Sequence, residues 1–115
     1  MDPVRKPVRF HGSALEDLRT FPEPAKQDAG FQLDRVQKGL DPDDWKPMKT
    51  VGKGVREIRI RDQDGGFRVV YIASLADAVH VLHCFQKKSR ATEKRDIELA
   101  SVRYRRLIQE QSNES

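Results

Sequence analysis

Basic side chains recur on one face of a predicted strand in the middle of the sequence. Residues 55–61 (VREIRIR) alternate, and a period of two places Glu57, Arg59 and Arg61 on one face, with two isoleucines on the other. The next predicted strand adds Arg68. A guanidinium group binds phosphate through two hydrogen bonds and stays charged. The pattern therefore indicates a phosphate-binding surface; a charged sheet face that only confers solubility is the alternative.

More basic residues follow the third predicted strand. Lys87, Lys88 and Arg90 lie in or next to a short basic loop. In three consecutive antiparallel strands, residues of this kind can converge at one end or on one face of the sheet. We therefore expect them to extend the surface that carries the arginines.

The histidines and the single cysteine do not form a metal-binding pattern. His80 and His83 are three residues apart on a predicted strand and should point to opposite faces, and Cys84 should face away from His83. We expect no metal site and a hydrogen-bonded, partly buried His83. One cysteine also excludes an intramolecular disulfide.

Other familiar chemical motifs are absent from the sequence. Neither a nucleotide-binding glycine loop nor a Gly-x-Ser-x-Gly elbow is present. Three aromatic residues have side chains that can stack on bases. Phe67 and Tyr71 share a strand face with Val69, which favours core packing, whereas Trp45 lies in a predicted loop and both roles stay open for it.

The elements that must position these residues are predicted from periodicity and turn residues. They are a strand at 7–11, a helical hairpin or one bent helix at 13–38, a loop at 41–54, strands at 55–61, 67–73 and 78–85, and a final helix after residue 92. We expect an α+β fold in which the three consecutive strands form an antiparallel meander. The helices should cover one face of the sheet and leave the other open.

Helix boundaries are indicated by capping residues. Ser13 followed by Glu16 has the spacing of a capping box, and Thr92 is a candidate N-cap for the final helix. Pro24 suits the first turn of a helix, and Gly39 suits a helix end.

Length, composition and charge define the class of protein. The chain has 115 residues, which predicts a single domain spanning 1–115 with an ordered core at about 7–110. Residues 1–45 contain 7 basic and 9 acidic side chains, whereas residues 46–110 contain 15 and 8, so the excess of positive charge lies in the second part. A positive surface attracts polyanions. With neither a membrane-spanning nor a signal-peptide pattern, we expect a cytoplasmic protein without membrane partners.

Four segments resemble the phage-related, HigB-like branch of the RelE/ParE toxin superfamily. They are GVREIRI at 54–60, FRVVY at 67–71, VLHCFQKKS at 81–89 and RDIELA at 95–100. The resemblance runs from about residue 8 to residue 107. It implies a RelE-like fold, with an N-terminal helical hairpin packed on a small twisted antiparallel sheet and a C-terminal helix.

The resemblance also implies an activity and partners. It implies a type II toxin neutralised by a cognate antitoxin, often a helix-turn-helix protein (HigA-like), and cleavage of mRNA in the ribosomal A site. By position, Arg68 matches a basic residue near the scissile phosphate, and Lys87 and Lys88 match basic positions after the last strand. The C-terminal tyrosine that some relatives use as a base has no obvious counterpart, because Tyr104 lies too far inside the helix.

We therefore expect a ribosome-dependent endoribonuclease that needs no metal or cofactor. The expected catalytic residues are Arg68, Lys87, Lys88 and Arg59, and the expected RNA-binding residues are Arg61, Arg90, Arg56 and His83. Arginines would stabilise the phosphate and a lysine would transfer a proton. A ParE-like inhibitor of DNA gyrase and a non-catalytic RNA-binding module are the alternatives.

Overall fold

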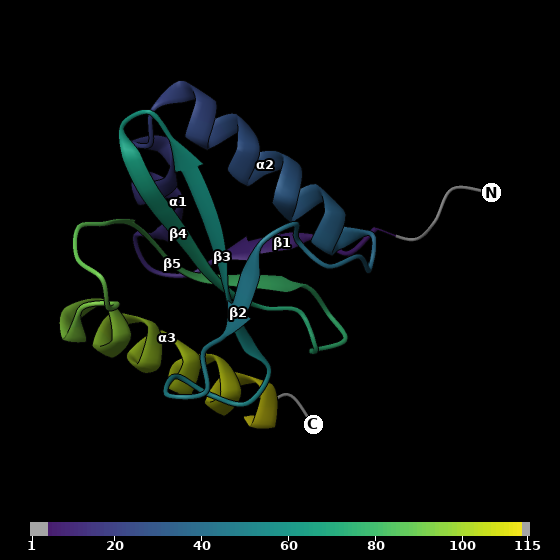
Figure 1. Cartoon of the computed structure of the whole chain (residues 1–115). Helices are drawn as coiled ribbons and strands as arrows, with labels where there is room; N and C mark the ends of the chain where they lie inside the picture. The colour runs from purple at the N-terminus through teal and green to yellow at the C-terminus, as the bar shows by residue number, and fades with distance from the viewer. Residues whose placement is uncertain (1–4, 114–115) are drawn as a thin grey trace.

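A five-stranded mixed sheet organises the computed structural model, which describes residues 5–113 (Figure 1). In chain order the elements are β1 (Val8–Phe10), α1 (Ala14–Arg19), α2 (Glu23–Gln37), β2 (Trp45–Pro47), β3 (Val55–Asp62), β4 (Gly65–Ile72), β5 (Val79–Lys87) and α3 (Lys94–Asn113). The strand order is β1-β5-β4-β3-β2, with β1 parallel to β5 and the other neighbours antiparallel. The expected α+β class, consistent with a RelE-like fold, is confirmed.

The β3–β4 hairpin follows directly from the alternating sequence. The strands pair in register from Val55 opposite Ile72 to Asp62 opposite Gly65. Gly65 has φ +127°, a backbone conformation that residues with a side chain rarely adopt, so glycine is needed to turn the chain here. The hairpin carries the residues of the predicted basic surface on two adjacent strands.

Helices α1 and α2 pack on one face of the sheet. Pro24 lies in the first turn of α2, as predicted, because its missing N–H would have no partner there. The apolar stripe of α2 buries Ala25, Ala29 and Leu33 against the sheet residues of the same core, and Phe67 and Tyr71 belong to that core, as expected. The capping box of α1 is wrong: the Ser13 side chain makes no cap and instead donates a hydrogen bond to Asp17.

Helix α3 packs on the opposite face, which corrects the expectation that this face stays open (Figure 1). Ala100 and Leu107 of α3 are buried with Val55, Val70 and Leu82 in a second apolar core. An amphipathic helix must bury its stripe, and the first face is already occupied by α1 and α2. The apolar residues of this second face end at Val70 along β4, so the half of the face nearest the hairpin turn lies beyond this core.

Two local features differ from the sequence-based expectations. The segment predicted as a loop at 41–54 contains the short strand β2, which pairs with β3 at the sheet edge. A register shift opposite Val70 and Tyr71 in β4 inserts one extra residue into β5. His83 therefore lies opposite Val70, on the α3 side, rather than on the face of Val79 and Val81.

The position of His80 also differs from the expectation. His80 lies opposite Ile72, so both histidines lie on the α3 face and the prediction of opposite faces is wrong.

Helix α3 continues to Asn113, and the last two residues of the chain lie outside the described residues. Within residues 5–113, no helix has the length and apolar character that crossing a membrane requires.

Candidate nucleic-acid interface

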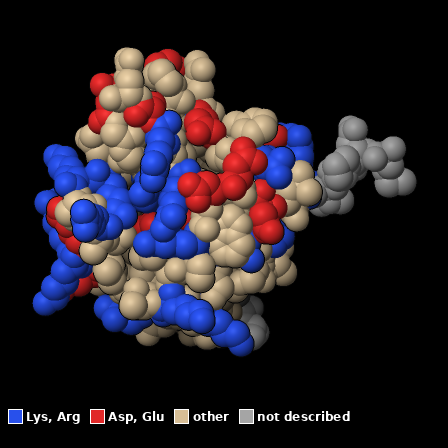
Figure 2. Space-filling model, in the orientation of Figure 1, with Lys and Arg blue, Asp and Glu red and all other residues tan. Residues whose placement is uncertain are grey.

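Three strands bring the predicted basic residues to one region of the sheet. Arg59 lies directly opposite Arg68 in the β3–β4 pair, and Lys87 lies opposite Gly66 in the β4–β5 pair. Directly opposed residues of antiparallel strands have their Cβ atoms about 5 Å apart. Figure 2 shows lysine and arginine side chains gathered over this part of the sheet and the loop before α3, beside a patch of acidic residues.

A shallow groove runs through this region, and we call it the basic groove. Its volume is about 680 Å³. It is lined by Arg61, Asp62, Gly65, Gly66, Arg68, Lys87, Lys88, Ser89 and Arg90. The structure thus brings together five of the eight residues predicted for catalysis or RNA binding, and Arg59 lies beside Arg68 at its edge.

Arg68 is the most buried of these cations. Only 5% of its surface is exposed, and its Nη1 donates a hydrogen bond of 3.0 Å to the carbonyl oxygen of Phe67. Burial lowers the pKa of the Arg68 guanidinium. Repulsion from Arg59 and Arg61 lowers this pKa further, whereas the negative charge of Glu57 raises it. A guanidinium still keeps its proton under these conditions. Its charge is therefore fixed in place at the floor of the groove.

Glu57 neutralises part of this charge from below the surface. Its carboxylate is fully buried, with Oε1 3.5 Å from Arg68 Nε and 3.5 Å from Lys46 Nζ. Oε2 accepts a hydrogen bond of 3.1 Å from the Thr92 hydroxyl. Thr92 thus contacts the sheet, whereas the sequence predicted that it caps α3. Glu57 connects β2, β3, β4 and the segment before α3.

Sequence reasoning did not assign a role to Glu57. The alternation of residues 55–61 does place this carboxylate on the same face as Arg59 and Arg61. A buried carboxylate is costly unless cations and donors surround it. A single acidic residue between arginines on a strand was therefore the signal that could have identified a structural counter-charge.

Lys87 lies in a strongly positive environment. Burial lowers its pKa, and repulsion from Arg68, Lys46 and Arg59 lowers it further, while Glu57 acts in the opposite direction. A lysine with a lowered pKa gives up its proton more readily. Among the groups of the basic groove, Lys87 is therefore suited to donating a proton.

Two predicted RNA-binding residues lie elsewhere. Arg56 lies on the α2 side of β3, where its guanidinium is 3.9 Å from the centroid of the Trp45 ring and 2.8 Å from Asp41. His83 is on the α3 side but does not line the groove, and its side chain is only 5% exposed. Its Nε2 lies 2.7 Å from an oxygen of Asp96, so the expected hydrogen bond is present, and the histidine is buried more completely than expected.

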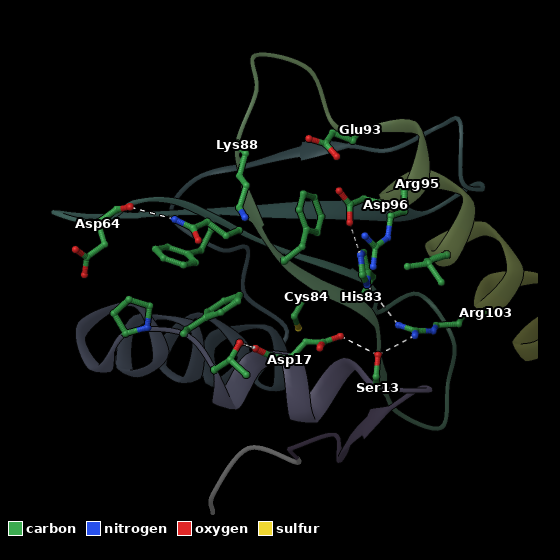
Figure 3. Close-up of a pocket in the computed structure, with 17 residues that line it drawn as sticks. Ser13, Asp17, Asp64, His83, Cys84, Lys88, Glu93, Arg95, Asp96 and Arg103 are labelled. Carbon is green, nitrogen blue, oxygen red and sulfur yellow. Dashed lines mark hydrogen bonds and ion pairs between the residues drawn. The ribbon is translucent and has the colours of Figure 1, made fainter.

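A second cavity of about 710 Å³ lies on the other side of β5, between α1 and α3 (Figure 3). Arg103 spans it by donating hydrogen bonds of 2.9 Å to the Leu82 carbonyl oxygen and 3.0 Å to Ser13 Oγ. Lys88 lines both this cavity and the basic groove, so the two hollows meet at that residue. We call this second hollow the α1–α3 cavity.

No group of three or more histidine, cysteine or acidic residues in the part of the chain that the structure describes could hold a metal ion. The charged side chains that line the basic groove carry mainly guanidinium and ammonium groups. Such groups bind phosphate and stabilise charge that develops on it.

Residues 16–105 match the family described as phage-derived protein Gp49-like (DUF891). This family is related to the RelE-like toxins of toxin–antitoxin systems. No curated protein matches the sequence. Because the match covers most of the chain and every strand from β2 to β5, the protein belongs to the Gp49-like family of phage-derived proteins.

Proposed function

We propose that the protein is the toxin of a type II toxin–antitoxin pair, from the HigB-like branch, and that it cleaves mRNA on the ribosome. The observation that carries the proposal is the basic groove, in which Arg68 is buried, charged and surrounded by further cations from β3, β5 and the loop after β5. A solubilising surface would expose its charges to water, whereas this arrangement holds one guanidinium in place at the cost of desolvation.

In the proposed reaction the 2′-hydroxyl of one nucleotide attacks the adjacent phosphorus, and the bond to the 5′-oxygen of the next nucleotide breaks. The products are a 2′,3′-cyclic phosphate and a 5′-hydroxyl. Arg68 and Arg59 stabilise the negative charge that builds on the phosphate oxygens, because planar guanidinium groups bind two oxygens at once. Arg61, Arg90 and Lys88 bind neighbouring phosphates of the strand.

Two protons must move during this step. The lowered pKa of Lys87 supports its assignment as the group that protonates the departing 5′-oxygen. Glu57 is fully buried and does not reach the attacking 2′-hydroxyl, whose proton passes to water or to a ribosomal group in this proposal.

The proposed partner is an antitoxin that neutralises the basic groove. Acidic or amphipathic segments bind such surfaces through complementary charge. An antitoxin bound there would exclude RNA and would block the five cationic side chains of the groove together.

The test is to map mRNA ends in translating extracts that contain the purified protein. Cuts in phase with codons support the nuclease, whereas gyrase-dependent DNA breaks identify a ParE-like inhibitor, and neither effect identifies a binding module. Arg68→Ala should slow cleavage about a hundredfold, since one lost stabilising contact typically costs about 3 kcal/mol.

Arg56→Ala is the matched control, because this arginine lies on the opposite face of the same strand pair and contacts Trp45 and Asp41. Both variants should be checked for folding by thermal denaturation. If Arg68→Ala folds and cleaves at the wild-type rate, or if both variants lose activity equally, the assignment of the groove is wrong.

A further inference from the structure

One aromatic ring lies at the boundary between the basic groove and the α1–α3 cavity. Phe85 is directly opposite Arg68 in the β4–β5 pair, so the two side chains are neighbours on the α3 face. Phe85 is partly exposed and lines the α1–α3 cavity. Proteins that bind single-stranded nucleic acids combine a positively charged groove along the backbone with aromatic rings on which bases stack.

The ring is supported from behind by His83. The centroids of the Phe85 and His83 rings are 5.1 Å apart, and their planes differ by 19°, so the two rings are stacked. Asp96 holds the histidine at Nε2, and Arg103 Nη1 lies 3.4 Å from its Nδ1 (Figure 3). This network fixes the orientation of His83 and thereby limits the movement of Phe85.

The other aromatic residues considered for base stacking are not placed for it. Phe67 and Tyr71 are buried in the core under α1 and α2. Trp45 lies opposite Ile58, which belongs to the same core, and the guanidinium of Arg56 covers its ring. Phe85 therefore has the position on the groove side that these three residues lack.

We propose that Phe85, backed by His83, is a stacking surface for one base of a single-stranded RNA, and that the α1–α3 cavity receives that base. The inference rests on the proposed function and extends it from the phosphate to the base. Lys88 lines both the basic groove and the α1–α3 cavity, so it lies where the RNA strand would pass from one to the other.

Stacking on an aromatic side chain depends weakly on base identity, because every base has a π-face. The polar lining of the α1–α3 cavity includes Arg95, Glu93 and Asp96, which can contact base edges. Phe85 therefore contributes affinity in this arrangement, and the cavity lining contributes any preference among bases.

The experiment uses an oligoribonucleotide that carries the fluorescent base 2-aminopurine next to a non-cleavable 2′-deoxy position. It is presented free and as the A-site codon of a ribosome complex. Stacking on Phe85 quenches 2-aminopurine, so wild-type protein should lower its fluorescence in at least one of the two forms. Phe85→Leu keeps an apolar side chain against the core and should abolish the quenching and weaken binding roughly tenfold.

Two further variants separate stacking from charge. Phe85→Tyr retains the ring and should retain the quenching. Lys88→Gln should reduce the salt dependence of binding while leaving the quenching at saturation unchanged. Thermal denaturation of each variant establishes that it is folded.

Distinct results refute the two proposals. If Phe85→Leu binds and quenches like the wild type while codon-phased cleavage continues, the stacking surface is refuted and the proposed function stands. If the wild type neither quenches the oligonucleotide nor cleaves mRNA, both are refuted.

Discussion

Replacing Glu57 with glutamine removes one negative charge from beneath the basic groove and keeps the shape of the side chain. The wild-type carboxylate is fully buried and lies 3.5 Å from both Arg68 Nε and Lys46 Nζ. After the change, Arg68 remains almost fully buried with no counter-charge at that position. We therefore expect Glu57→Gln to destabilise the fold.

The magnitude follows from the burial of the partners. Breaking a buried ion pair by removing one member costs about 3–5 kcal/mol. Lys46 is 34% exposed and the groove is open to water, so the loss should lie at the lower end, at about 3 kcal/mol of unfolding free energy. For a chain of 115 residues this corresponds to a fall of roughly 12 °C in Tm.

Urea denaturation of four proteins measures the effect: the wild type, Glu57→Gln, Arg68→Met and the double variant. The double variant leaves no buried charge without a partner, so it should be more stable than the sum of the two single losses predicts. Two results would show that the carboxylate does not hold Arg68. One is that the stability losses of the two single variants add up in the double variant. The other is that the unfolding free energy of Glu57→Gln lies within about 0.5 kcal/mol of the wild type, which is the scatter of neutral surface changes.

Three other predictions concern residues outside the groove. Burial and the neighbouring His80 ring lower the pKa of His11, so the unfolded chain takes up a proton below about pH 6.5 that the folded chain does not. Stability should therefore fall as the pH falls from 6.5, and His11→Gln should reduce this slope in urea denaturation. A Cβ at Gly52 would overlap the Tyr104 ring, so Gly52→Ala should lower the free energy of unfolding by about 1–3 kcal/mol. Gly30 lies on α2 with open space around the position of a Cβ, so Gly30→Ala should raise Tm. Burial raises the pKa of the Cys84 thiol to about 12, so a thiol reagent at pH 8 should label it only after unfolding, and rapid labelling of the native protein would contradict this.

Local patterns were sufficient to predict β3, β4, β5 and the basic face, whereas β2 was missed. The alternation in 55–61 and the turn residues Asp64 and Gly65 define the hairpin, and the period of two places Arg59 and Arg61 on the face that carries the groove. These signals are local, because strand geometry and turn conformation depend on neighbouring residues.

Long-range features were beyond sequence reasoning. The apolar stripe of α3 shows that one side of the helix is buried but not which face of the sheet covers it. The bulge opposite Val70 moves His83 to the other face, and no residue type in β5 marks the extra position. The burial of Glu57 depends on Thr92, which is 35 residues away in the sequence.

The position of α3 explains why one half of a sheet face is a core and the other half is the basic groove. Ala100 and Leu107 cover the part of the face that ends at Val70, and the next residue of β4 on that face is Arg68. The hydrogen bond from Thr92, just before α3, to Glu57 links the start of the helix to this boundary. Because the apolar cover ends at Val70, Arg68 lines the basic groove, and Glu57 supplies a counter-charge to it.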